Sequence, residues 1–268
     1  MTRLLGYIGN QYDRARCAAQ IESAALTPPD GGVDGWGVGT LVGGEALLRR
    51  KPLGSAGAGV AALLAETRGG VALIRLRAPG PTARSLENTQ PFRFRQWLYA
   101  DLSPGDRPEA RAALSGQVPG YLSGNVRGDT VSELRFHAAV AALFDEGRVD
   151  DAGVDRETVV SALRVAVARC DAASGGAQAL AMIVAWPQGL VAFCRGIALS
   201  WARRQGVRDC PACRRGDSSV DHETLRYVMV ADAPATERGW KEVGRGTLPE
   251  AGLFLTVDRD FDVQERPA

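Results

Sequence analysis

The sequence has no long apolar run and no large excess of charge of one sign. Its 268 residues contain no stretch of about 18 consecutive apolar side chains, the length that a membrane-spanning helix needs. They carry 32 basic and 31 acidic side chains, which gives a formal net charge of +1. Because nucleic acids and anionic membrane surfaces attract proteins with an excess of positive charge, we expect neither as a partner.

Three further features are missing: a signal peptide, a disulfide framework and a phosphate-binding loop. The first residues do not divide into basic, apolar and small-residue regions, which predicts a cytoplasmic protein. The five cysteines are odd in number and scattered, which argues against a set of disulfides. No glycine-rich loop follows a predicted strand, so the pattern does not favour a nucleotide-binding fold.

The sequence does contain a succession of short strands, two long helices and then more strands. Strands are predicted at 4–8, 34–44, 45–52, 71–77 and 95–101, with short helices at 15–25 and 59–67. Longer helices are predicted at 131–145 and after Asp155. Strands return at 179–186, 190–196, 197–201, 225–234 and 252–258. This order favours an α+β fold with antiparallel sheets, and the length favours one domain over residues 1–268.

Several short stretches then stand in a characteristic order. They are TRLLGYIG from Thr2, DGWGVG from Asp34, LENTQPF from Leu86, WLYADLS from Trp97, GDTVSE from Gly128, and VMVADAP followed by Trp240. In this order they resemble the class II glutamine amidotransferases, in particular the stand-alone YafJ/EgtC-like branch of this N-terminal nucleophile hydrolase family. The resemblance covers nearly the whole chain and implies a four-layer αββα sandwich with two antiparallel sheets.

The resemblance also implies a reaction, in which an N-terminal cysteine attacks the side-chain amide of glutamine and its own α-amine moves the proton. Thr2 stands in the place of that cysteine. Removal of Met1 would leave Thr2 with a hydroxyl nucleophile and an amine base on one residue. A hydroxyl is a poorer nucleophile than a thiol, yet threonine alone does not exclude catalysis.

The residues that the resemblance implies for the oxyanion hole have changed. Where the family has His-Asn-Gly, this sequence has Asp101, Leu102 and Ser103. A leucine side chain cannot donate a hydrogen bond, and loss of one oxyanion donor lowers a rate by about 10²–10³. A carboxylate at Asp101 would repel a developing oxyanion if it pointed toward it.

Substrate-binding positions have also changed. Arg77 aligns with the arginine that the family uses for the α-carboxylate of glutamine, whereas Val131 stands where an aspartate binds the α-amine. Arg75 and Gln90 each replace a histidine. Because the nucleophile, the oxyanion donor and the amine ligand have changed together, we predict that glutaminase activity has been lost.

Arg75 and Arg77 are two residues apart on a predicted strand and therefore point to the same face. Two guanidinium groups on the wall of a pocket would favour a small anionic ligand over a zwitterion. The alternative is that one of them forms an ion pair with Asp101 or Glu87 and stabilises the fold. Asp34 and Trp36 of the DGWGVG loop are further candidate ligand contacts, although the tryptophan is equally explained by packing.

The motif Cys210-Pro-Ala-Cys213 lies outside the resemblance. Two thiolates in this spacing can share a metal ion or form a redox pair, and His222 is near enough in sequence to be a third ligand. A structural zinc site usually needs four ligands, and Cys17, Cys170 and Cys194 all fall on predicted helices or strands. We therefore favour a polar loop with two incidental cysteines, and expect no cofactor.

These observations leave three functions open. The first is an amidotransferase-like protein without catalysis that binds a small anionic ligand or a protein partner. The second is an N-terminal threonine amidohydrolase with Thr2 as nucleophile and a substrate other than glutamine. The third is a metal or redox module built on Cys210 and Cys213.

Overall fold

The structure is a computed structural model that describes residues 2–28, 30–53, 58–103, 108–207, 210–213, 222–246 and 250–268. In these residues the strands form two sheets, and every pair of neighbouring strands is antiparallel. The first sheet has the order β11-β9-β10-β1-β4-β2-β3 and the second has the order β13-β12-β8-β7-β6-β5.

The first sheet consists of β1 (Leu4–Gly9), β2 (Gly35–Val42), β3 (Glu45–Lys51), β4 (Val71–Arg77), β9 (Ser200–Gln205), β10 (Arg226–Ala231) and β11 (Trp240–Glu242). The second consists of β5 (Phe92–Phe94), β6 (Trp97–Leu102), β7 (Leu180–Trp186), β8 (Gly189–Arg195), β12 (Leu253–Asp258) and β13 (Val263–Pro267). The helices are α1 (Ala15–Ile21), α2 (Val60–Ala65), α3 (Pro108–Ser115), α4 (Gly120–Ser123), α5 (Val131–Asp145) and α6 (Arg156–Ala173), with a 3₁₀ turn at Val243–Gly246.

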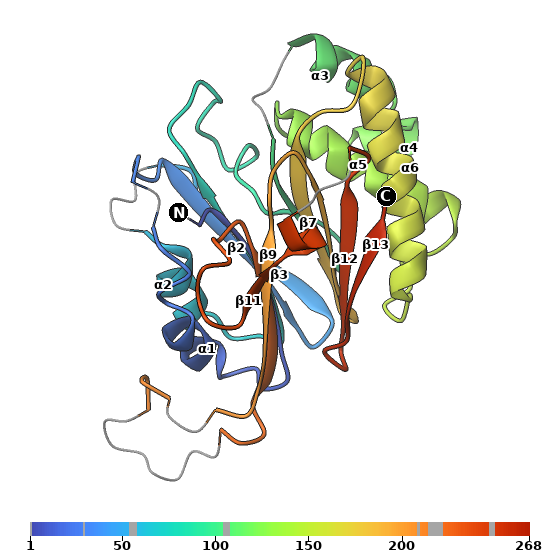
Figure 1. Cartoon of the computed structure of the whole chain (residues 1–268). Coiled ribbons are helices and arrows are strands. Elements are labelled where there is room, and N and C mark those ends of the chain that lie inside the picture. Colours follow the sequence, from blue (N-terminus) through green and yellow to red (C-terminus); the bar gives the residue numbers. More distant parts are fainter. Residues whose placement is uncertain are drawn as a thin grey trace.

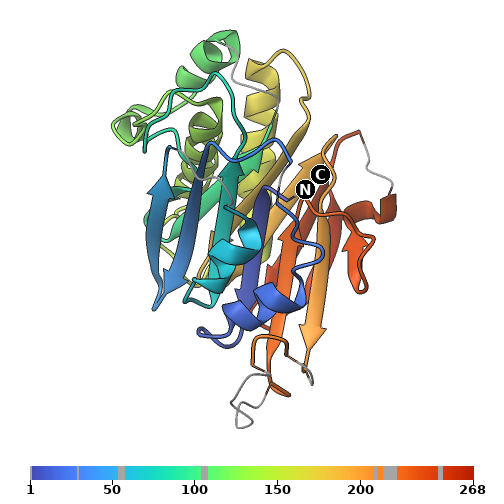
Figure 2. The same cartoon turned by 90° about the vertical axis from the view of Figure 1, so that its left-hand side faces the viewer.

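The elements form four layers. Helices α1 and α2 lie on one side of the sheets, and α5 and α6 lie on the other side (Figure 1). Turned by 90°, the molecule shows α1 and α2 lying across the face of the first sheet (Figure 2). Three apolar cores separate the layers, and the middle one, around Leu73, Leu98 and Ile183, lies between the two sheets. The predicted αββα sandwich is therefore confirmed.

The two long helices begin where their capping residues predict. The hydroxyl of Thr130 accepts a hydrogen bond from the backbone N–H of Glu133 at 3.2 Å, and Asp155 accepts one from the N–H of Thr158 at 2.9 Å. Such caps satisfy N–H groups that have no partner inside the helix.

Over the part of the chain that is described, no helix has both the length and the apolar character needed to cross a membrane.

Two elements differ from their predicted bounds. Helix α1 ends at Ile21 and is followed by the buried Glu22, whose carboxylate binds Arg204. The strand predicted from residue 197 begins only at Ser200. The reason is that β8 belongs to the second sheet and β9 to the first, so residues 196–199 carry the chain across the sandwich and cannot pair as a strand.

The glycines of DGWGVG bring the edges of the two sheets close together. A side chain on Gly37 would collide with the backbone carbonyl of Gln90, and one on Gly39 would lie 2.8 Å from the side chain of Leu98. Real side chains do not come this close. Glycine at these positions therefore lets the segment that carries Gln90 and the start of β6 pack directly on β2.

Candidate functional site

Two of the motifs that are distant in sequence bind each other directly. The side-chain oxygen of Asn88 accepts a hydrogen bond from the backbone N–H of Asp129 at 2.7 Å. The carboxylate of Glu133 accepts hydrogen bonds from the N–H groups of Arg127 and Gly128 at 2.9 and 2.7 Å. A side chain on Gly128 would clash with Asn88. LENTQPF and GDTVSE thus form one wall beside the end of β4.

This wall borders an open pocket with about 480 Å³ of empty space. Its lining consists of Arg75, Arg77, Thr82, Asn88, Gln90, Asp101, Ser103, Thr130 and Ser132. Of the candidate residues from the sequence, Arg75, Arg77, Gln90, Asp101 and Ser103 therefore meet in one place. The pocket is strongly polar, because every side chain that lines it carries a hydrogen-bonding group.

The carboxylate of Asp101 is buried and fully engaged with other side chains. One oxygen accepts hydrogen bonds from Ser132 at 2.6 Å and Gln90 at 3.0 Å, and the other accepts them from the Tyr99 hydroxyl at 2.9 Å and Arg135 at 3.0 Å. The contact with Arg135 is also an ion pair. A buried carboxylate is tolerated when it is paired and hydrogen-bonded in this way. Asp101 therefore contributes little free charge to the pocket.

Arg75 lines the same pocket and uses its donors on backbone carbonyls. Its Nε donates to the carbonyl of Asp101 at 2.7 Å, and Nη1 donates to the carbonyl of Leu76. Within the described residues no carboxylate forms an ion pair with it. Desolvation by burial lowers the pKa of Arg75 to about 10, so the guanidinium stays protonated at neutral pH.

Arg77 shares one carboxylate with a second arginine. Asp34 lies 3.5 Å from Nη2 of Arg77 and accepts a hydrogen bond from Nε of Arg84 at 2.9 Å. Nη2 of Arg77 also donates to the carbonyl of Pro52 at 2.6 Å, whereas its buried Nε has no hydrogen-bond partner among the described residues. Burial lowers the pKa of Arg77. The ion pair with Asp101 or Glu87 suggested from the sequence is not found among the described residues, because Arg77 pairs with Asp34 and the carboxylate of Asp101 pairs with Arg135.

Thr2 lies outside the lining of the pocket and has no exposed surface. Its backbone nitrogen donates to the carbonyl of Thr27 at 2.8 Å, and its hydroxyl donates to the carbonyl of Ala25 at 3.2 Å. Asp232 holds the start of β1 by accepting hydrogen bonds from the N–H groups of Arg3 and Leu4, both at 2.8 Å. Both potentially reactive groups of Thr2 are thus engaged with the backbone.

The remaining candidates lie away from the pocket lining. Leu102 packs in the apolar core between the sheets, and Val131 packs in the core beneath α5 and α6. Trp36 pairs with Leu76 across the strands, belongs to the core beneath α1 and α2, and has the guanidinium of Arg49 over its ring at 5.2 Å. Asp34 acts on the pocket only through its ion pair with Arg77.

The sequence interpretation missed Tyr99, Ser132 and Arg135, the partners of Asp101. Ser132 and Arg135 are three residues apart on α5, so they lie on the same side of that helix. An arginine in a mainly apolar helix was the available signal, because buried charges are almost always paired.

A second cluster of candidate residues forms on the outer side of the first sheet. The side chains of Cys210, Cys213 and His222 lie together, and Cys17 of α1 joins them. The expectation that no fourth ligand is available was therefore wrong. Its cause is that α1 packs on the first sheet beside the segments that flank β9 and β10, which places Cys17 next to residues that are far away in sequence.

Neither a protein-family model nor a curated protein matches the amino-acid sequence, but solved structures match the fold. A glutamine aminotransferase class-II domain protein from Silicibacter pomeroyi is 19% identical, with a TM-score of 0.60, and the match covers 99% of this chain and 98% of that one. A predicted glutamine amidotransferase from Pseudomonas aeruginosa is 16% identical, with a TM-score of 0.53 and coverage of 99% and 96%.

A third match is a larger enzyme, the glutamine phosphoribosylpyrophosphate amidotransferase of B. subtilis in complex with ADP and GMP. It is 13% identical with a TM-score of 0.54, and the match covers 98% of this chain but 48% of that one. At these identities the similarity establishes the fold. The chain therefore has the fold of the class II glutamine amidotransferases, an N-terminal nucleophile hydrolase sandwich.

Proposed function

We propose that this protein is an amidotransferase-like protein without glutaminase activity that binds a small anionic ligand in the pocket beside β4. The observation that carries the proposal is the charge of the pocket. Arg75 has no carboxylate partner among the described residues, and Arg77 shares Asp34 with Arg84. Since the carboxylate of Asp101 is neutralised by Arg135, the lining keeps an excess of positive charge.

Three features support the loss of glutaminase activity. The hydroxyl of Thr2 is buried and donates to a carbonyl, so it does not face the pocket. Leu102 packs between the sheets and offers no donor for an oxyanion. Val131 is apolar and buried, so the α-amine of glutamine would have no carboxylate at that position.

The side chains of the pocket also favour an anion over an amino acid as the ligand. The guanidinium groups of Arg75 and Arg77 can donate hydrogen bonds to a carboxylate or phosphate. The buried Nε of Arg77 is one donor that a ligand or a water molecule would satisfy. Asp101 is the only acidic side chain among the described residues of the lining, and it already accepts four hydrogen bonds and is not available to an ammonium group.

Two measurements on the purified full-length protein test the proposal. Isothermal titration calorimetry would measure binding of succinate, glutarate, inorganic phosphate and glutamine, and a coupled assay would measure ammonia release from glutamine. We expect one of the anions to bind more tightly than glutamine, and no ammonia release. In Arg77→Gln, affinity for that anion should fall by about 10- to 100-fold, the value of a lost charged hydrogen bond.

Arg49→Gln is the matched control, because Arg49 is an exposed arginine of the same sheet that pairs with Glu66 outside the pocket. It should bind the anion as the unmodified protein does. Ammonia release that disappears in Thr2→Ala would show a working hydrolase and contradict the proposal. Absence of binding by all the anions, or equal binding by Arg77→Gln, would contradict the assignment of the pocket.

A further inference from the structure

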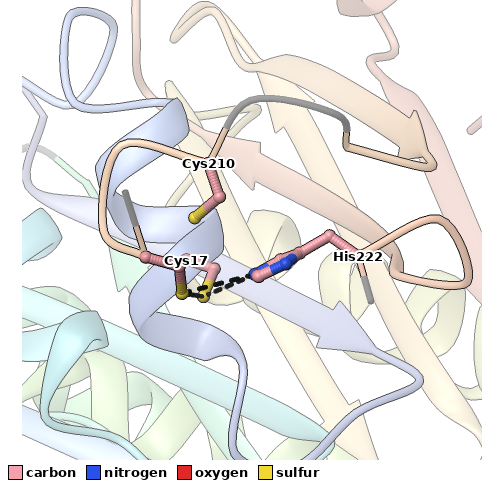
Figure 3. A group of neighbouring side chains, drawn as sticks. Cys17, Cys210 and His222 are labelled. Carbon is pink, nitrogen blue, oxygen red and sulfur yellow. Dashed lines mark hydrogen bonds between the residues drawn. The ribbon is translucent and has the colours of Figure 1, made fainter. Parts of the chain in front are cut away.

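Four metal-binding side chains from three segments converge on the outer side of the first sheet. Cys17 comes from α1, Cys210 and Cys213 follow β9, and His222 precedes β10. Figure 3 shows the thiols of Cys17 and Cys210 and the imidazole of His222 pointing toward one another. The four ligand atoms all lie within 4.8 Å of one another.

The separations between these atoms match a tetrahedral zinc site. Sγ of Cys17 lies 3.7 Å from Sγ of Cys213, and Nε2 of His222 lies 3.2 Å from the first sulfur and 3.6 Å from the second. Zinc bound at about 2.3 Å to sulfur and about 2.0 Å to nitrogen holds two sulfurs about 3.8 Å apart and a sulfur and nitrogen about 3.5 Å apart. An ion could therefore be bound with small side-chain movements.

The ligand types and their surroundings narrow the class of metal. Thiolates and imidazole prefer zinc and other soft or borderline ions over calcium and magnesium, which need oxygen ligands. Cys17, Cys210 and His222 are buried, and Cys213 is partly exposed. Four protein ligands fill a tetrahedral shell and leave no position for a substrate, which is typical of structural zinc sites.

Two backbone hydrogen bonds hold the segments that carry the ligands. The N–H of Cys213 donates to the carbonyl of Cys210 at 3.2 Å, which closes the turn of the Cys-Pro-Ala-Cys motif. The N–H of Val207 donates to the carbonyl of His222 at 2.9 Å and so ties the two ends of the β9–β10 connection together. The pair of cysteines and the histidine are thus held on one side of the cluster, facing α1.

We propose that Cys17, Cys210, Cys213 and His222 bind one zinc ion in a structural site that fastens the β9–β10 connection to α1. Cys17 and Cys210 belong to the core between the first sheet and its helices, and none of the four ligands is among the described residues that line the polar pocket. The site is therefore separate from the proposed anion pocket, and either proposal can fail without the other.

Metal content and cobalt substitution test the site directly. Full-length protein purified without chelators should contain about one zinc per chain by elemental analysis, as a closed four-ligand site requires. After removal of the metal under reducing conditions, Co²⁺ should bind with one ion per chain. It should give intense visible bands of tetrahedral cobalt and a near-ultraviolet thiolate-to-cobalt charge-transfer band.

Single substitutions identify the ligands. Cys17→Ser, Cys213→Ser and His222→Gln should each lose bound zinc and the tetrahedral cobalt spectrum. Cys170→Ser is the matched control, because Cys170 is buried in α6 and lies outside the cluster, so it should retain both. Cys17→Ser is the decisive variant, since Cys210 and Cys213 could bind metal weakly without α1.

Three results would overturn the proposal. The first is purified protein without zinc, iron or another transition metal that also gives no thiolate–cobalt band in its reduced form, a result that does not depend on the folding of any variant. The second is full metal content in Cys17→Ser. The third is a disulfide between Cys210 and Cys213, found by peptide mass analysis in freshly purified protein that still binds no Co²⁺ after the disulfide has been reduced.

Discussion

The polar pocket beside β4 and the cysteine cluster beneath α1 both contain several ionisable side chains. They differ in whether these side chains find partners of opposite character within the chain. In the pocket, the carboxylate of Asp101 meets three neutral donors and the guanidinium of Arg135. In the cluster, three thiols and one imidazole face one another, and all four groups can donate an electron pair to the same ion. The Asp101 network is satisfied by the chain itself, whereas the cluster suits an added cation.

This difference separates a structural network from a binding site. A buried acceptor that is surrounded by donors has a structural role without any ligand, because removal of one member of the network would leave a buried polar group unpaired. Several electron-pair donors that converge need a cation between them, and several cations that converge need an anion. The same reasoning applies to the two arginines of the pocket, where the cations outnumber the available carboxylates in the part of the chain that is described.

The largest effect is expected from breaking the Asp101 network. Asp101→Asn keeps the shape of the side chain but leaves the guanidinium of Arg135 buried without its counter-ion. Removal of one partner of a buried ion pair costs about 3–5 kcal/mol in the free energy of unfolding. Urea or guanidinium denaturation measures this loss of stability. Asp129→Asn is the control, because its ion pair with Arg111 is exposed and contributes at most about 1 kcal/mol. Equal effects of the two substitutions would show that the Asp101 network does not stabilise the fold.

The next largest effect is expected from removing the metal. A chelator should lower the free energy of unfolding by about 2.7 kcal/mol when free zinc had been a hundredfold above its dissociation constant. Thermal denaturation measures the change, and amide hydrogen exchange should increase in α1 and around Val207. In Cys17→Ser the chelator should have no effect. An unchanged melting temperature in the unmodified protein would contradict a structural role for the ion.

The sequence predicted the parts of the fold that local signals determine. Thr130 and Asp155 cap α5 and α6, so the first residue of each helix could be predicted. Gly147, with a positive φ of 69°, follows the end of α5 and marks where that helix stops. Helices α3 and α4 were not predicted, because they are short and lack a long apolar period. The layers followed from the resemblance and from the order of the elements.

The two sites were only partly predictable, because long-range packing assembles them. Arg75 and Arg77 could be assigned to one face from the period of a strand. Tyr99 is two residues from Asp101 on β6 and therefore shares its face. The other partners of Asp101 come from α5 and the segment before β5, and no spacing in the sequence reveals them. Cys17 was judged unavailable because it lies in a helix, yet that helix presents it to the cluster.

A smaller effect is expected at the wall of the pocket. In Gly37→Ala the added methyl group would collide with the carbonyl of Gln90, whose side chain binds Asp101. Overpacking of this kind costs about 1–3 kcal/mol in the free energy of unfolding. Gly120→Ala is the control, because no atom lies within 4 Å of the added carbon, and it should change stability by about 0.5 kcal/mol or less. Denaturation of both variants measures the difference, and a tolerated Gly37→Ala would show that the sheet edges can move apart.

The smallest effect is expected from pH, and it separates the two histidines of the chain. His222 faces the thiols of the cluster, whereas His137 is buried in α5 and its Nδ1 donates to the carbonyl of Glu133 at 2.9 Å. Burial lowers the pKa of His137 below its usual value of 6.5. The unfolded chain therefore takes up a proton first as the pH falls, so this residue should destabilise the fold below about pH 6.5 and have a constant effect above it.

His137→Gln tests this point, because glutamine does not titrate. The free energy of unfolding should be measured for both proteins from pH 5 to pH 8, roughly the range in which histidine titrates. The difference between them at each pH isolates the contribution of residue 137. We expect the unmodified protein to lose stability relative to His137→Gln as the pH falls below about 6.5. A difference that is the same at every pH would show that the pKa of His137 is not lowered in the folded protein.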